Sequence, residues 1–307
     1  MKAASPIVSV IIPTYYRNER LKAAIDSVLH TKYDSLEVIV VDDSGEDNAK
    51  PVAEQYDDLR YVSLDKNRGQ NAALNRGLEE ISGAYVQFLD DDDEVFPGKF
   101  AKQVSLLESS PHTGVAYCGI ENDNGEMKLP SADGRGSVLE DVLTFSLAPA
   151  VTSTMLFDRF SLEEIMPLPT PPGSTDIYMK IELAQVTEFD SVDEALIRKR
   201  DSADSVGASK AAIEGHRMVF EKYRDVYDQF DESIRKQALA RFFNRAGRFY
   251  VSEHLWSPRA ISAFGNALYH SPGISVPYLG RFVGSMFGRP GVTIVERGMQ
   301  RIHRPRR

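Results

Sequence analysis

The stretch Val8-Ser9-Val10-Ile11-Ile12, which runs into Pro13-Thr14-Tyr15, decides how the first half of the chain folds. Its near-continuous valine and isoleucine content predicts a central strand that is covered on both faces. A second run of the same kind, Leu36-Glu37-Val38-Ile39-Val40-Val41, follows after a segment with helical periodicity. Two buried strands joined by a helix predict a parallel sheet flanked by helices.

Strands and helices continue to alternate through the rest of the first half. Asn18 can cap the first helix, whose apolar residues fall on one face, and Pro51 suits the first turn of the second helix. A third helix is expected over 70–81 because its apolar residues recur at helical spacing. The expected strands are 8–12, 36–41, 60–64, 84–89 and 115–118.

The pattern changes after Ile120. The turn signal Asp123-Asn124-Gly125 leads to a second apolar segment at 147–157, and the proline-rich loop 167–173 opens onto an amphipathic helix at 176–185. We therefore predict an α/β fold with a mostly parallel sheet flanked by helices, a mixed second half and a helical C-terminal extension. The expected domains are 1–208, which divides into halves 1–122 and 123–208, and the extension 209–307.

The composition is that of a globular enzyme with unevenly distributed charge. The net charge is −9, yet the segment from Val276 onward has seven arginines and one acid, so it carries +6 and the preceding residues carry −15. An acidic body argues against nucleic acid as the main ligand. The single cysteine, Cys118, can form no internal disulfide. Because neither a signal peptide nor an apolar window of about 18 residues is recognisable, we expect a cytoplasmic protein that is at most peripheral on the membrane.

Acidic residues follow three of the first four expected strands, as Asp42-Asp43, Asp65 and Asp90-Asp91-Asp92-Asp93. Ligands of open parallel sheets bind at this carboxyl edge. Four consecutive carboxylates repel one another unless a cation neutralises them, and hard divalent metals prefer carboxylate oxygens. In an extended chain Asp90 and Asp92 project to one side, so they could hold one Mg²⁺ or Mn²⁺ whose shell a substrate diphosphate completes.

Each acidic group also has a purely structural interpretation. Asp92 or Asp93 could cap the helix that begins near Pro97, and Asp42-Asp43 could form a simple turn before Ser44-Gly45. Acidic groups at two neighbouring strand ends favour the metal site over either alternative taken alone.

Four motifs in this order and spacing resemble family 2 glycosyltransferases over the first third of the chain. The resemblance implies a GT-A fold that binds a nucleotide-diphospho-sugar in residues 1–122 and an acceptor in 123–208. The motifs are Val8-Ser9-Val10-Ile11-Ile12-Pro13-Thr14-Tyr15, Val40-Val41-Asp42-Asp43-Ser44, Asn67-Arg68-Gly69 with Ala73-Leu74-Asn75-Arg76-Gly77-Leu78, and Phe88-Leu89-Asp90-Asp91-Asp92-Asp93 with Pro97.

Matched position by position, the resemblance implies roles for several side chains. Tyr15 would stack near the base, and Asp43 would accept a hydrogen bond from the base or ribose. Asp90 and Asp92 would form the D-x-D metal site, with Asp92 as the direct ligand. The other donor contacts implied are Pro13, Arg68, Asp91 and Arg200.

The match is looser in the second half of the chain. Gly173-Ser174-Thr175-Asp176 is similar to the family's Glu-Asp pair at the start of a helix, with Thr175 in place of the glutamate. It implies that Asp176 is the catalytic base, and helix N-capping by Asp176 is a compatible alternative. Arg198-Lys199-Arg200-Asp201 resembles the family's arginine-rich segment near the donor phosphates, although it lacks the usual histidine. Asp201 could replace that histidine, or the segment could be a solvated basic loop.

The resemblance implies an inverting transfer in which Asp176 takes the acceptor proton while a metal stabilises the departing diphosphate. The donor would be a UDP-, GDP- or dTDP-linked sugar. A sugar-nucleotide nucleotidyltransferase is an alternative, although no glycine-rich loop follows the first strand. An inactive sugar-nucleotide-binding scaffold is another, supported by Thr175 and the missing histidine.

The segment 275–287 mixes apolar residues with Arg281 and precedes the basic tail. Such a stretch can lie at an anionic bilayer surface. We therefore expect docking beside a saccharide or lipid-linked acceptor, such as a polyprenyl or dolichyl phosphate carrier. The segment is equally well interpreted as an ordinary packed helix followed by a solubilising tail.

Overall fold

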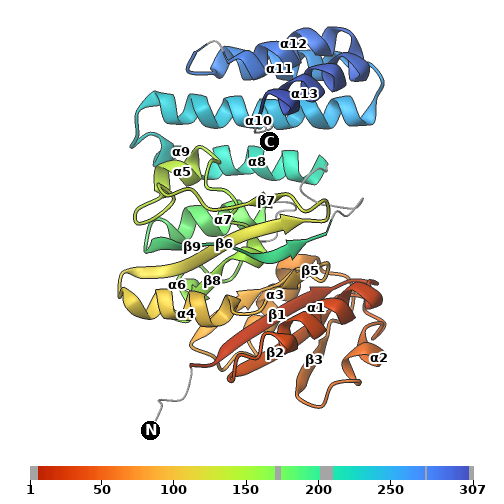
Figure 1. The fold of residues 1–307 in the computed structure, drawn as a ribbon, viewed down its shortest axis with the longest axis vertical. Coiled ribbons are helices and arrows are strands. Elements are labelled where there is room, and N and C mark those ends of the chain that lie inside the picture. Colours follow the sequence, from red (N-terminus) through yellow and green to blue (C-terminus); the bar gives the residue numbers. More distant parts are fainter. Residues whose placement is uncertain (1–5, 170–173, 201–209, 274, 304–307) are drawn as a thin grey trace. The chain divides into compact units, whose positions relative to one another are not determined.

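The computed structural model describes residues 6–169, 174–200, 210–273 and 275–303, and the chain divides into two compact units (Figure 1). The domain boundary predicted at residue 208 lies outside the described residues. The first unit comprises Met1–Val142, Ser146–Pro171 and Thr175–Ala203, and the second comprises Leu143–Phe145, Pro172–Ser174 and Asp204–Arg307.

A sheet with the strand order β3-β2-β1-β4-β8-β6-β9-β5 forms the centre of the first unit, and β7 pairs with β6 outside this path. Strands β1 to β4 are mutually parallel where they pair, whereas β8 and β5 run antiparallel to their neighbours. The predicted α/β fold class is confirmed. The strands are β1 Val8–Thr14, β2 Leu36–Asp42, β3 Leu59–Ser63, β4 Tyr85–Phe88, β5 Asp93–Val95, β6 Thr113–Asn122, β7 Met127–Lys128, β8 Leu156–Asp158 and β9 Glu188–Lys199.

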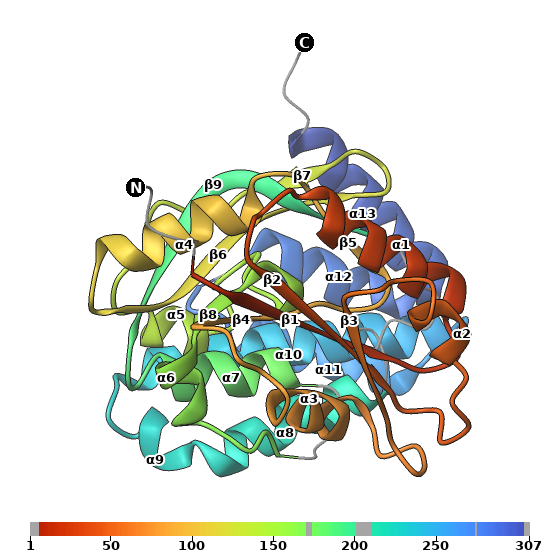
Figure 2. The same cartoon turned by 90° about the horizontal axis from the view of Figure 1, so that it is seen from below.

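Helices α1 (Asn18–His30) and α3 (Gln70–Leu78) cover opposite faces of β1 and β2 (Figure 2). Val10 and Ile12 share a buried cluster with Leu21 and Ile25 of α1. Ile11 lies on the other face of β1 and meets α3 at Gly77, where an added Cβ would stand only 2.5 Å from Ile11 Cγ2. The central strand is thus buried on both faces, as its valine and isoleucine content predicts.

The predicted cap of α1 is wrong. The N-cap residue is Arg17, and Asn18 is the first residue of the helix. The Asn18 side chain instead donates through Nδ2 to the carbonyl oxygen of Asn48, at 3.0 Å. This bond ties α1 to the residues before α2 (Lys50–Ala53), whose first turn contains Pro51 as predicted.

The second half of the first unit adds the antiparallel strands and four helices. Asp123-Asn124-Gly125 joins β6 to β7, as the turn signal predicts. Asn75 of α3 holds the proline-rich loop, because its Nδ2 donates to the Leu168 carbonyl at 2.9 Å and its Oδ1 accepts from the Leu168 N–H at 2.8 Å. The helices are α4 Lys99–Ser109, α5 Leu139–Leu143, α6 Arg159–Glu163 and α7 Thr175–Leu183, with the short 3-10 helix η1 at Thr152–Thr154.

The described part of the second unit is helical, and Val251, Ala260, Phe264 and Val292 form a buried cluster within it. None of the helices in the described part of the chain is long and apolar enough to cross a membrane. The helices are α8 Lys210–Lys222, α9 Arg224–Tyr227, α10 Glu232–Glu253, α11 Pro258–His270, α12 Val276–Met286 and α13 Gly288–His303.

Candidate active site

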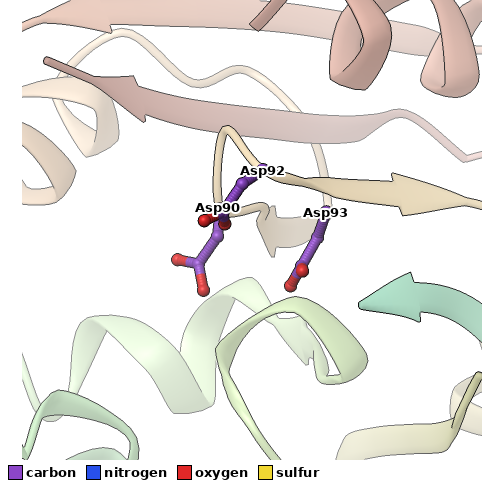
Figure 3. Close-up of side chains that lie close together, drawn as sticks. All are labelled: Asp90, Asp92 and Asp93. Atoms are coloured by element: carbon purple, nitrogen blue, oxygen red, sulfur yellow. The ribbon is translucent and has the colours of Figure 1, made fainter. Parts of the chain in front are cut away.

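The four consecutive aspartates form a turn between β4 and β5, which we call the acidic turn, Asp90–Asp93. The N–H of Asp93 donates to the carbonyl oxygen of Asp90 at 3.1 Å. The extended conformation assumed from the sequence is therefore wrong at this point. The turn brings one carboxylate oxygen each of Asp90, Asp92 and Asp93 within 4.8 Å of one another (Figure 3).

Asp93 is the member of this group that the sequence motif did not single out. Its side chain is fully buried, and its Oδ1 has no hydrogen-bond partner among the described residues. Burial raises the pKa of Asp93 to about 7, although nearby Lys199 opposes the shift. Three clustered carboxylates with one unsatisfied buried oxygen fit a divalent cation, since hard cations take oxygen ligands. The signal in the sequence was the fourth aspartate of the run.

Two arginines of the α1 region approach the outer side of the acidic turn. Arg17 Nη1 lies 3.2 Å from Asp91 Oδ1 and 3.2 Å from Asp92 Oδ2, and Arg20 Nη1 lies 3.5 Å from Asp92 Oδ2. Thr14 at the end of β1 donates to Asp91 Oδ2 at 2.8 Å. Burial raises the pKa of Asp91 to about 6 despite these partners. The predicted metal ligand Asp92 is thus ion-paired in this structure, and neither Asp92 nor Asp93 caps α4, whose N-cap is Gly98.

Asp42 at the end of β2 and its neighbour Asp43 hydrogen bond to different parts of the chain. Asp42 is fully buried and accepts hydrogen bonds from the Ser44 N–H, the Ala49 N–H and the Tyr61 hydroxyl at 2.9, 2.7 and 2.8 Å. It therefore builds the turn that the structural interpretation of this pair anticipates. The predicted donor contact is its neighbour Asp43.

Asp43 reaches across to the loop before α3. Its two carboxylate oxygens accept from the N–H groups of Arg68 and Gly69, each at 2.7 Å. Gly69 has φ +86°, a left-handed conformation that favours glycine, and it precedes Gln70, the first residue of α3. Gln70 Nε2 then donates to Asp90 Oδ1 at 2.8 Å. The ends of β2 and β4 are thus connected through the Arg68–Gln70 loop.

Tyr15 and Pro13, predicted to line the nucleotide, lie at the end of β1 and just beyond it. Pro13 pairs with Val41 of β2 in the parallel register. The Tyr15 side chain is about half exposed and packs edge-on against Tyr16, with ring centroids 4.7 Å apart. An exposed aromatic ring at a strand's carboxyl edge can offer a face to a base.

Asp176 is the second residue of α7, so it lies inside the helix instead of at the N-cap position. Its Oδ2 lies 3.4 Å from Lys180 Nζ, which also donates to the Ala150 carbonyl at 2.7 Å. The charge of Asp176 contributes to the raised pKa of Asp90, although burial is the largest cause. The base predicted from the sequence therefore lies close enough to the acidic turn to interact with it electrostatically. Thr175, which replaces the family's glutamate, hydrogen bonds to Asn71 of α3.

The basic segment at the end of β9 meets the acidic turn through strand pairing. Lys199 lies opposite Asp93 in the antiparallel register of β5 and β9, with its Nζ 3.3 Å from Asp93 Oδ2 and 4.0 Å from Asp90 Oδ2. Arg200, the predicted phosphate contact, forms an ion pair with Glu94. Asp201, the suggested substitute for the family histidine, lies outside the described residues.

The family model described as Glycosyl transferase family 2 matches residues 9–166, which include residues 9–14 of β1, the Asp43 contacts and the acidic turn. The chain therefore belongs to glycosyl transferase family 2 and is a glycosyltransferase. The resemblance drawn from its motifs is confirmed. This assignment favours the transferase interpretation over the nucleotidyltransferase alternative.

Curated relatives agree with the family assignment. An uncharacterized glycosyltransferase of Rickettsia prowazekii is 28% identical over 76% of this chain and 74% of its own length. A GalNAc(5)-diNAcBac-PP-undecaprenol beta-1,3-glucosyltransferase of Campylobacter jejuni is 36% identical over 42% of this chain and 43% of its own length. The second match thus covers less than half of either protein.

Solved structures share the fold at low sequence identity. S. aureus TarS 1-349, determined in complex with UDP-GlcNAc, has a TM-score of 0.62 and 17% identity over 98% of this chain and 93% of that one. The mannosyltransferase PcManGT of Pyrobaculum calidifontis, in complex with GDP-Man and Mn²⁺, has a TM-score of 0.54 and 19% identity over 98% and 89%. Both are glycosyltransferase folds, as the GT-A expectation requires.

Proposed function

We propose that this glycosyltransferase moves a sugar from a nucleotide-diphospho-sugar to an acceptor with inversion at the anomeric carbon, using Mg²⁺ or Mn²⁺. The observation that carries the proposal is the meeting of three carboxylates in the acidic turn, with Asp176 nearby. The complexes of TarS with UDP-GlcNAc and of PcManGT with GDP-Man and Mn²⁺ support a donor of this class.

Each group of the site has a distinct part in the proposed reaction. A cation held by Asp90, Asp92 and Asp93 would supply Lewis-acid stabilisation of charge on the departing diphosphate. Asp43 holds the Arg68–Gly69 backbone and so shapes the loop beside the nucleotide, while Tyr15 offers its ring to the base. Asp176, held by Lys180, takes the proton from the attacking acceptor hydroxyl.

Two substitutions separate donor binding from proton transfer. Asp92→Ala removes a cation ligand, so the increase in melting temperature that a UDP-, GDP- or dTDP-sugar produces with Mn²⁺ or Mg²⁺ should disappear. Asp176→Asn keeps the size of the side chain and removes the base, so donor binding should stay nearly intact while turnover falls by about 10² to 10⁴.

The matched control is Asp58→Asn, which removes an exposed carboxylate outside the site. It should retain both the metal-dependent shift and the turnover. Wild-type turnover in Asp176→Asn would exclude Asp176 as the base. If no donor shifts the melting temperature of the folded wild-type protein with either metal, the proposed donor class is wrong.

We propose further that the acceptor is lipid-linked and that the second unit docks on an anionic membrane. The name of the Campylobacter jejuni relative places its acceptor on an undecaprenol diphosphate. In this chain α12 exposes Val276, Leu279, Val283 and Met286, spaced along one face of the helix. No acid lies in α12, and seven arginines follow Ser275. An apolar face with basic surroundings suits the surface of an anionic bilayer.

A further inference from the structure

The acidic turn has to be neutralised even when no divalent cation is bound. Four carboxylates stand in four consecutive residues, and three of them approach within 4.8 Å through their oxygens. Charges of one sign this close repel strongly, above all beside a fully buried side chain such as Asp93. The protein places cations of its own beside these carboxylates.

The internal cations divide the acidic turn into two sides. Arg17 and Arg20 approach the side formed by Asp91 and Asp92. On the other side Lys199 approaches Asp93 at 3.3 Å and Asp90 at 4.0 Å. Two of the three clustered carboxylates thus face the ammonium group of Lys199, which occupies the neighbourhood where a divalent cation would be held.

Strand pairing fixes the backbone of Lys199 but not its side chain. Its backbone pairs with Asp93 across β5 and β9, so it always enters the site beside this carboxylate. Its side chain has four flexible carbons and remains about a third exposed, whereas Asp93 is fully buried. The ammonium group can therefore turn away from the carboxylates while the strands stay paired.

We propose that Lys199 is a positioning residue that makes cation binding depend on the donor diphosphate. The effect of the diphosphate in this proposal rests on the proposed donor class. Without nucleotide, the ammonium group repels a divalent cation from Asp90 and Asp93 and keeps its affinity low. When a diphosphate binds, the ammonium group donates hydrogen bonds to the phosphate oxygens, and the carboxylates become available to the cation. Cation and nucleotide then favour each other's binding reciprocally.

The test is a titration of the full chain with Mn²⁺, followed by electron paramagnetic resonance, with and without UDP and with GDP as a second nucleotide. Lys199→Gln removes the charge but leaves an amide that can hydrogen bond to Asp93. Without nucleotide it should bind Mn²⁺ roughly tenfold more tightly than the wild type, and UDP should raise the affinity less. A merely structural role for Lys199 would weaken Mn²⁺ binding instead.

Two control variants test whether the effect comes from the charge at position 199. Lys199→Arg keeps the charge and should retain the weak Mn²⁺ binding of the wild type. Lys102→Gln removes the same charge from an exposed ion pair with Glu194 and should change nothing. Equal or weaker Mn²⁺ binding by folded Lys199→Gln without nucleotide would overturn the proposal.

The experiment also separates this proposal from the proposed function. If UDP and GDP both fail to bind, the donor class is wrong, while the titration without nucleotide still decides whether Lys199 opposes the cation. If Lys199→Gln does not fold, the wild type decides: Mn²⁺ affinity that is the same with and without a bound nucleotide overturns the proposal.

Discussion

At the scale of single residues, Lys99 is a charge placed fully inside the first unit. Its Nζ donates to the side-chain oxygen of Gln87, and Gln87 in turn donates to the Ser153 carbonyl at 3.0 Å. Burial lowers the pKa of Lys99 to about 8. The folded protein therefore releases this proton at a lower pH than the unfolded chain, in which a lysine has a pKa of about 10.4.

We predict that the free energy of unfolding rises with pH above about pH 8, because there the unfolded chain binds more protons than the folded protein. The Lys99 contribution should reach about 1.5 kcal/mol between about pH 8 and pH 9.5. Urea denaturation at the two pH values measures it. Lys99→Met should lack this rise, whereas Lys102→Met, at an exposed position, should keep it. The same rise in wild type and Lys99→Met would contradict the prediction.

The sequence could assign residue types to the site but could not assign their partners. The motifs pointed to Asp43, Asp90, Asp92 and Asp176, and the structure gathers the acidic turn with Asp176 close by. The contribution of Asp93 was missed because an extended strand would point it away from Asp90 and Asp92, whereas the actual turn points it toward them. Which of two adjacent aspartates builds a turn and which holds a loop also depends on distant partners, such as Tyr61 for Asp42.

At the scale of elements, the close contact of α3 with β1 depends on Gly77. An added Cβ would lie 2.5 Å from Ile11 Cγ2 and 3.1 Å from Val41 Cγ2. Ile11 and Val41 are both fully buried, so neither can easily move aside. The glycine thus lets the helix lie close to the sheet.

Gly77→Ala should lower the free energy of unfolding by up to about 2 kcal/mol, since overpacking costs about 1 to 3 kcal/mol and helix propensity returns roughly 1 kcal/mol of this. Gly298→Ala is the matched control. Gly298 lies in α13, is exposed and has nothing within 4 Å of an added Cβ, so this change should be neutral or stabilising. Thermal unfolding of both variants measures the difference. A Gly77→Ala protein as stable as the wild type would show that the sheet adapts.

Elements held by local signals were predictable, and elements held by distant pairing were not. The valine- and isoleucine-rich runs gave β1 and β2, and Asp123-Asn124-Gly125 gave the β6–β7 turn. Strand β9 was not anticipated. It contains several acidic residues, and its buried and exposed positions do not alternate regularly along the strand. Its conformation depends on pairing with β6 and β5, far away in the sequence.

At the scale of the whole molecule, the uneven charge and the exposed face of α12 together predict binding to anionic membranes. The full chain should bind vesicles that contain phosphatidylglycerol more tightly than vesicles of phosphatidylcholine alone, and added salt should weaken this binding. Replacing Val283 and Phe287 together by aspartate should weaken it about tenfold or more, because both side chains are exposed and apolar. Vesicle co-sedimentation measures the affinities.

Met127→Asp is the control, since Met127 is also an exposed apolar residue but lies on β7 in the first unit. It should bind vesicles like the wild type. Substitutions test docking better than removal of the residues after Gly273, because truncation would also take Val292 out of the buried cluster with Val251 and Phe264. Unchanged binding by the double aspartate variant would exclude docking through α12.

The pairing of Lys199 with Asp93 can form only late in the synthesis of the chain. The two residues are 106 positions apart, so a ribosome synthesises the acidic turn long before the lysine that neutralises it. A nascent chain that ends before β9 carries the four aspartates without this counter-charge and without the strand that pairs with β5. Translation that stops early should therefore release a fragment whose sheet lacks β9 and leaves β5 unpaired. The cell's proteases can recognise and degrade such a fragment.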